Sequence, residues 1–132
     1  MRVATNHWRS RAGSRPLRLG EPWLAPRRGL VLYHWQHRRA RARAYYEAIW
    51  RWYYHSGAQC IHDHEGSWTD TGAPYWGGFQ MTLWFQQTYG ARYVARYGLA
   101  DQWPPAVQIR VTRSVAGGGD WAQWGTRGLC GL

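Results

Sequence analysis

A single glutamate, Glu65, stands in a stretch rich in aromatic residues and glycine, HEGSWTDTGAPYWGGFQM, which begins at His64. We expect Glu65 to close a short helix, because the next residue is glycine, a common helix terminator. The negative end of a helix disfavours another negative charge, and nearby aromatic rings can exclude water from a carboxyl group. Both effects favour the protonated carboxyl, the form that a general acid needs. The alternative is an ordinary glutamate in a helix C-terminal turn. The aromatic candidates are Trp68, Tyr75 and Trp76.

Two other motifs carry polar or flexible residues but do not predict a cofactor. His62 and His64 flank Asp63, but two histidines at i and i+2 cannot face one ion from a regular helix. The glycines at 117–119 lack the lysine and hydroxyl residue of a phosphate-binding loop. We therefore expect solvated histidines, no metal site and no cofactor.

The elements that would position Glu65 are predicted to be mainly helical. Apolar residues recur at helical spacing on both sides of the glutamate, and Cys60 and His64 would share one helix face at i and i+4. Glycine and proline indicate a loop or short hairpin over residues 67–78. The tail, residues 121–132, shows no period. The predicted helices cover residues 32–55, 58–65, 81–89 with a break at Gly90, a further turn at 93–97, and 105–116.

The composition indicates one small, basic domain. The 132 residues suffice for a single modest core. Its 17 basic residues, all arginine, outnumber 7 acidic ones and give a net charge of +10. Such a charge favours a polyanionic partner, which is a nucleic acid, an anionic membrane face or a wall polymer. The 11 Trp and 9 Tyr suit cores and wet grooves alike. The arginines are densest at Arg38, Arg39, Arg41 and Arg43.

The chain is expected to divide into a basic N-terminal segment, residues 1–43, which is disordered or loosely attached, and a folded domain, residues 44–132. No stretch approaches the roughly 20 apolar residues of a membrane span, and no clear signal peptide is visible. The two cysteines, Cys60 and Cys130, fit one disulfide in an exported protein. Two free buried thiols are the alternative.

An ordered set of residues runs through the second half of the chain and carries a resemblance to a known family. The set resembles the transglycosylase-like, lysozyme-related domains of actinobacteria, including the resuscitation-promoting factors, and it covers about half of the chain. Its members are Cys60, Glu65-Gly66, Trp68, Thr71-Gly72, Tyr75, Gly77-Gly78-Phe79-Gln80-Met81, Trp84-Phe85-Gln86, Tyr89-Gly90, Tyr97-Gly98, Ala100-Asp101, Trp103-Pro104, Gln108-Ile109, Trp121, Trp124 and Cys130-Gly131-Leu132.

The resemblance implies a lysozyme-like α+β fold and cleavage of the β-1,4 bond between N-acetylmuramic acid and N-acetylglucosamine in peptidoglycan. Glu65 falls on the family's catalytic acid, with Asp63 as the rival position, and Gln80 falls on a glutamine that lines the cleft. Peptidoglycan strands, with anionic wall polymers, are then the expected partners of a monomer located outside the cell or in its wall. The expected substrate-binding residues beside Gln80 are Tyr75, Trp68, Trp76 and Gly78.

The number of acids near Glu65 bears on the reaction. Glycosidases commonly pair two carboxyl groups, roughly 5–5.5 Å apart when retaining and about 6.5–9.5 Å apart when inverting. Asp70 is the candidate second acid for hydrolysis. In a single-acid mechanism, Glu65 protonates the glycosidic oxygen and then deprotonates the muramoyl 6-hydroxyl, which leaves a 1,6-anhydro product. We prefer this single-acid mechanism to hydrolysis by a small margin. A nucleic-acid-binding module and a wall-binding domain without turnover remain as alternatives.

Overall fold

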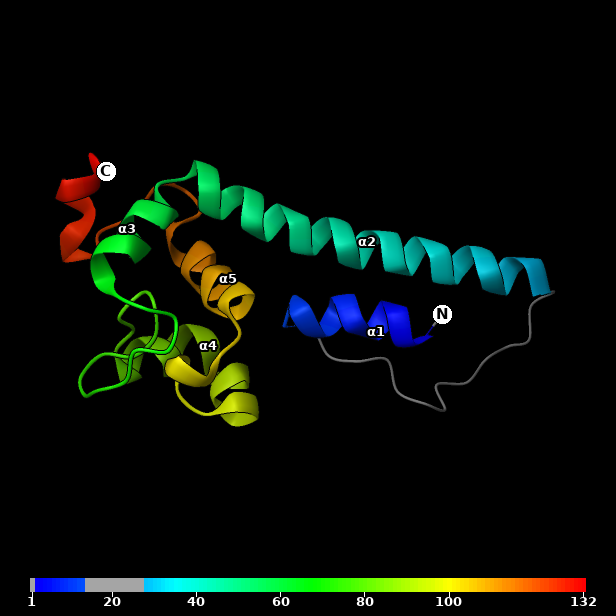
Figure 1. The fold of residues 1–132 in the computed structure, drawn as a ribbon, viewed down its shortest axis with the longest axis horizontal. Helices are drawn as coiled ribbons and strands as arrows, with labels where there is room; N and C mark the ends of the chain where they lie inside the picture. The colour runs from blue at the N-terminus through cyan, green and yellow to red at the C-terminus, as the bar shows by residue number, and fades with distance from the viewer. Residues whose placement is uncertain (1, 14–27) are drawn as a thin grey trace. The chain divides into compact units, whose positions relative to one another are not determined.

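The computed structural model describes residues 2–13 and 28–132 and is mainly helical there, as expected (Figure 1). The chain forms two compact units, Met1–Ala48 and Ile49–Leu132, which we describe separately. The domain boundary expected after residue 43 stays a prediction, and residues 14–27 of the expected N-terminal segment lie outside the described residues. The helices are α1 (Arg2–Arg11), α2 (Arg28–His55), α3 (Ala58–Glu65), α4 (Leu83–Tyr97), η1 (Ala100–Gln102), α5 (Pro105–Ala116) and η2 (Gly125–Cys130).

The first unit contains α1 and most of α2. Helix α1 lies in a segment without a sustained apolar period, and α2 begins four residues before the predicted start at residue 32. Aromatic and arginine side chains join the two helices. The rings of Trp8 and Tyr46 lie 5.7 Å apart, and Arg11 Nη2 donates a hydrogen bond of 2.8 Å to the Tyr46 hydroxyl. The guanidinium of Arg43 lies 5.7 Å from the Trp8 ring.

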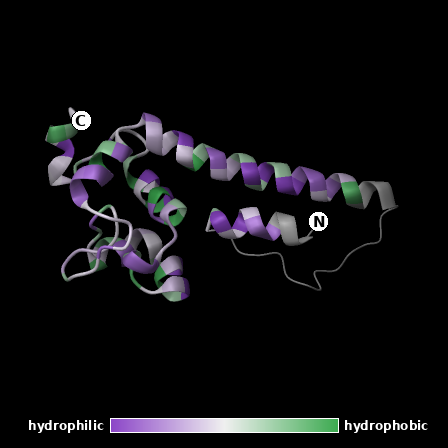
Figure 2. Cartoon of the chain, in the orientation of Figure 1, coloured by the Kyte–Doolittle hydropathy of each residue, from purple (hydrophilic) through white to green (hydrophobic). Residues whose placement is uncertain are grey.

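Helix α5 supplies the centre of the core in the second unit. Proline stands at its start, where the missing N–H is not needed. Three valines at helical spacing turn towards the core, since Val107 and Val111 are buried and Val115 is half-buried. Figure 2 shows hydrophobic residues along α5 and mostly hydrophilic ones along α2. The buried residues of α5 are Ala106, Val107, Gln108, Ile109, Val111, Thr112 and Ala116.

Helix α4 differs from the prediction at both ends. It begins at Leu83 rather than at residue 81, and Thr82 caps it by accepting a hydrogen bond from the Phe85 N–H. Gly90 has non-helical dihedral angles and kinks the helix without ending it, so the turn predicted at 93–97 belongs to α4. Trp103 packs closely at this kink, because a Cβ at Gly90 would lie 2.5 Å from the Trp103 ring.

The segment between α3 and α4 is a turn-rich loop closed by one antiparallel bridge. Trp76 and Met81 exchange two backbone hydrogen bonds, of 3.1 and 2.8 Å. Between them, Gly77 adopts φ +73° and Gln80 adopts φ +48°, the left-handed region in which a residue other than glycine is uncommon. The predicted loop or short hairpin is therefore a tight hairpin that presents Gln80 at its bend.

The tail after α5 is held to α3 by a covalent bond. Cys60 of α3 and Cys130 of η2 form a disulfide, with Cα atoms 5.9 Å apart. The expected bridge is thus confirmed, and the described residues contain no free cysteine. None of the described helices combines the length and apolar character that crossing a membrane requires.

Candidate active site

Glu65 is the last residue of α3, as predicted, and its carboxyl group is held by a residue from the far end of the chain. Gly66 follows with φ +150°, a conformation that glycine tolerates. The Thr126 hydroxyl in η2 donates a hydrogen bond of 2.5 Å to Glu65 Oε1. Glu65 itself is half-buried. Because Cys130 ties η2 to α3, the same tertiary contact that docks the tail also fixes the orientation of Glu65.

Asp70 and Gln80 both lie against Gly66, the residue that follows Glu65. A Cβ at Gly66 would collide with Asp70 Oδ2 and would lie 3.1 Å from Gln80 Nε2. Asp70 Oδ1 accepts a hydrogen bond from the Ser67 hydroxyl at 2.8 Å, and Oδ2 accepts from the Ser67 N–H at 3.1 Å. Gln80 Nε2 donates to Asp70 Oδ2 at 3.4 Å and to the Gly77 carbonyl at 3.1 Å. Both carboxylate oxygens of Asp70, the predicted second acid, therefore accept hydrogen bonds.

Gln108, in α5, holds the hairpin in place through hydrogen bonds. It was not among the predicted site residues. Its side chain is fully buried. Its Oε1 accepts a hydrogen bond of 2.8 Å from the Gly78 N–H, and its Nε2 donates to the Trp68 carbonyl at 2.8 Å. The same amide also donates to the carbonyls of Ala100 and Trp103. A buried glutamine inside an otherwise apolar helix face was the sequence signal for this role, because a buried amide needs partners.

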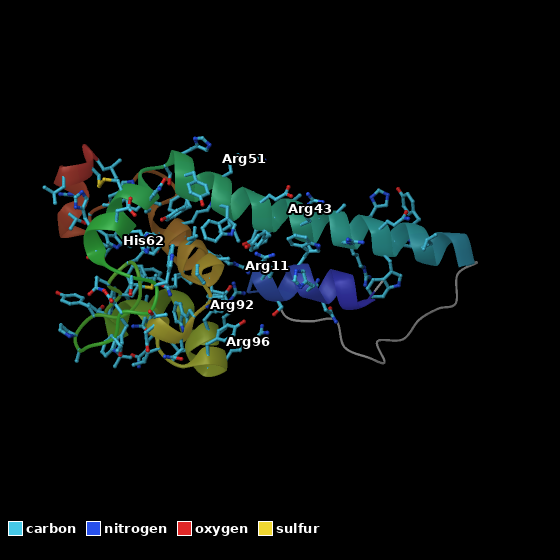
Figure 3. All side chains as sticks on the ribbon, viewed as in Figure 1. Arg11, Arg43, Arg51, His62, Arg92 and Arg96 are labelled. Atoms are coloured by element: carbon cyan, nitrogen blue, oxygen red, sulfur yellow. A yellow bond between two sulfur atoms is a disulfide. The ribbon has the colours of Figure 1, made fainter. Side chains whose placement is uncertain are left out.

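Trp68 is half-buried and packs on α3. Its ring stacks on the His62 imidazole, with centroids 3.8 Å apart and planes inclined by 20°, and His62 projects from α3 (Figure 3). Gly78 completes this packing, because a Cβ there would lie 2.5 Å from His62 Cδ2 and 2.9 Å from Trp68 Cε3. These contacts give Trp68 and Gly78 a structural role beneath the hairpin.

His62 and Tyr53 form a polar pair within this aromatic cluster. The Tyr53 hydroxyl and His62 Nδ1 lie 2.8 Å apart. Burial, helped by the charge of Asp63, raises the pKa of Tyr53 to about 12. Burial also lowers the pKa of His62 below its ordinary value of 6.5, against the opposing attraction of the carboxylates of Asp63 and Asp70. The cluster therefore holds a neutral imidazole, and the expectation of a solvated side chain is wrong for His62.

The neutral His62 predicts a loss of stability in mild acid. The unfolded chain takes up a proton on this histidine near pH 6.5, whereas the folded chain resists it. The free energy of unfolding should thus fall as the pH drops below about 6.5, because the unfolded state binds more protons. Urea unfolding at pH 7.5 and 5.5 measures this. His62→Gln should reduce the difference in unfolding free energy between the two pH values. His55→Gln, a change at an exposed histidine, should leave that difference unchanged. Equal pH dependence in the wild type and both variants would contradict the assignment of a neutral His62.

A small, open pocket lies on the other side of Gln80. Tyr75, which is 48% exposed, and Gln80 both line it. Its wall is fixed from below, since the Trp124 Nε1 donates a hydrogen bond of 3.0 Å to the Phe79 carbonyl. Two of the predicted substrate-binding residues thus meet at one pocket. The remaining lining residues are Phe79, Met81, Thr82, Phe85, Gln123 and Trp124.

The other predicted site residues lie apart from this pocket. Trp76 is half-buried and takes part in the backbone bridge. Asp63 is exposed, with its Oδ1 3.7 Å from His62 Nδ1. Asp70 and Gln80 lie together against Gly66, the residue that follows Glu65, and Gln80 also lines the pocket with Tyr75.

No known protein family, curated protein or solved structure matches this chain.

Proposed function

We propose that residues 49–132 form a lysozyme-like domain that cleaves the β-1,4 bond between N-acetylmuramic acid and N-acetylglucosamine in peptidoglycan. The observation that carries the proposal is the placement of Glu65. It ends α3 and is oriented by Thr126, and the residue after it, Gly66, lies against Asp70 and Gln80, the second of which also lines a pocket. A carboxyl group with a fixed orientation suits acid–base cleavage of a glycan, and the pocket that Gln80 lines offers a place for a sugar.

In this mechanism Glu65 acts twice. As an acid it protonates the glycosidic oxygen, and as a carboxylate it then accepts the proton of the muramoyl 6-hydroxyl. The Thr126 hydroxyl supports both stages, because a hydroxyl can donate to a carboxylate and can accept from a carboxylic acid. The side chain therefore keeps its orientation while its protonation state changes.

The partners of Asp70 favour transglycosylation over hydrolysis. A second catalytic carboxylate must turn an oxygen towards the sugar or a water molecule, and hydrogen bonds within the protein hold it in another direction. Both Asp70 oxygens already accept hydrogen bonds, from Ser67 and from Gln80. We therefore assign Asp70 the task of fixing the turn and the Gln80 amide, and we propose a 1,6-anhydro product made by Glu65 alone.

Mass spectrometry of the muropeptides released from purified peptidoglycan tests the proposal. Anhydro ends would support transglycosylation, and reducing ends would support hydrolysis with Asp70 as the second acid. Binding to peptidoglycan without released products would identify a wall-binding domain instead. Neither binding nor products would contradict the proposal altogether.

Gln80 is expected to position the substrate. Its amide is half-buried and reaches the pocket, so a bound sugar hydroxyl would lose a partner in Gln80→Ala. We expect the transition state to lose about 1–3 kcal/mol of stabilisation, measured as the fall in kcat/KM on soluble glycan strands. Gln123→Ala changes another glutamine of the same pocket wall and serves as the comparison. Unchanged kinetics in Gln80→Ala would restrict this residue to a role in the hairpin.

A second candidate function follows from the arginines of α2. Arg38, Arg39, Arg41 and Arg43 are all exposed, and such a surface suits a polyanion. Arg43 also binds Glu47 at 2.6 Å, which neutralises part of the charge. If the polyanion is a nucleic acid, its affinity should fall steeply with salt. Weak, salt-insensitive binding to polynucleotides would rule out this candidate and leave a wall polymer or an anionic membrane face as the partner of these arginines.

A further inference from the structure

Three side chains that suit a metal ion meet where η2 docks on α3. Ligand atoms of Cys60, His64 and Cys130 all lie within 4.8 Å of one another. The cysteines are half-buried and the histidine is exposed, so the cluster opens to solvent on the His64 side. Sequence spacing explains half of this arrangement, because Cys60 and His64 are one turn apart on α3. The fold supplies the rest by bringing Cys130 from 70 residues away.

This set of atoms fits zinc when the cysteines are reduced. Zinc binds thiolate sulfur at about 2.3 Å and imidazole nitrogen at about 2.0–2.1 Å, so its tetrahedral ligand atoms lie roughly 3.3–3.8 Å apart. The ligand atoms of Cys60, His64 and Cys130 are at most 4.8 Å apart, which is within about 1.5 Å of the separations that zinc requires. Two thiolates and an imidazole are soft to intermediate ligands, which favour Zn²⁺ over Mg²⁺ or Ca²⁺. Three protein ligands would leave the fourth position to water on the exposed side.

We propose that Cys60, His64 and Cys130 form a zinc site in the reduced protein, which the disulfide replaces in the oxidised protein. A dithiol reductant donates two electrons and two protons, the sulfur–sulfur bond breaks, and the reductant becomes a cyclic disulfide. Zn²⁺ then displaces the two thiol protons and forms two zinc–sulfur bonds and one zinc–nitrogen bond. In the oxidised protein each sulfur is bonded to the other, and neither offers a thiolate.

The zinc site would keep the tail in place in a reducing environment. Both forms of the cluster connect α3 to η2, and η2 carries the Thr126 hydroxyl that holds Glu65. The inference does not depend on the reaction proposed for Glu65, because it rests on the ligand atoms alone.

Cobalt titration of the full chain tests the site. The protein is reduced with dithiothreitol, freed of the reductant under nitrogen, and titrated with Co²⁺, which reports thiolate ligation by a charge-transfer absorption in the near ultraviolet. We expect one Co²⁺ per chain, displacement by Zn²⁺, and no such absorption in the oxidised protein. His64→Ala should weaken binding by at least about tenfold, since one ligand of three is lost, while His55→Ala should bind as the wild type does.

The exposed position of His64 keeps the test independent of folding. The oxidised His64→Ala protein should retain its disulfide and its melting temperature, which shows that the fold is intact. Reduced wild-type protein that binds no Co²⁺, or binds it no more tightly than His64→Ala, would overturn the proposal. So would thiolate-free binding of equal affinity in the oxidised protein, because it would place the ion on surface histidines.

Discussion

Glu65→Gln is expected to lower the rate of muropeptide release from peptidoglycan by at least about 100-fold, the lower end of what general acid–base catalysis contributes. Glutamine has nearly the shape of glutamate and can still accept a hydrogen bond from Thr126, but it has no acid proton to donate. The measurement is the initial rate of soluble muropeptide release at equal protein concentration.

The neighbouring acid supplies the matched control. Asp63→Asn removes an exposed carboxylate two residues before Glu65 and should leave the rate within about twofold, as surface changes usually do little. Both variants should melt within a few degrees of the wild type. If Glu65→Gln stays active while Asp63→Asn loses activity, the acid is Asp63. If both variants stay active, the single-glutamate mechanism is wrong.

Replacing both cysteines with serine, as Cys60→Ser with Cys130→Ser, is expected to lower the free energy of unfolding by about 4 kcal/mol. The bridge joins residues 70 positions apart, and its loss restores the loop entropy of the unfolded chain. For a unit of this size, the melting temperature should fall by about 15 °C or more. Differential scanning calorimetry of oxidised wild type and variant, both with a chelator present, measures the effect without a contribution from metal.

Reduction provides the control for the disulfide. A dithiol reductant should lower the melting temperature of the wild type towards that of the double variant and should not affect the variant. A wild type that melts at the same temperature before and after complete reduction would show that contacts between α3 and η2, rather than the covalent bond, hold the tail.

Local signals in the sequence predicted the helices and one covalent contact. Glycine and proline mark the ends of α3 and the start of α5, because their backbone restrictions act within a few residues. The position of Glu65 at a helix end follows from the same signal. The cysteine pair was predictable because only two cysteines exist in the chain.

Local signals in the sequence could not predict the contacts between distant segments. They also could not predict the stacking of Trp68 on His62, because packing under the hairpin rather than spacing sets it. Met81 continues the apolar period of α4, yet its backbone pairs with Trp76 because the two-hydrogen-bond bridge competes with helix formation there. No local pattern pointed to Thr126, which reaches Glu65 across 61 residues.

The buried amide of Gln108 supports the shape of the hairpin that bears Gln80. The hairpin has one bridge, and an isolated hairpin is at best marginally stable in water. Its other anchors, at Trp68 and Gly78, are hydrogen bonds to a side chain 40 and 30 residues further along the chain. The final shape of the hairpin therefore depends on α5, and a change that displaces Gln108 should disturb the segment that bears Gln80 although the two glutamines are 28 positions apart in the sequence.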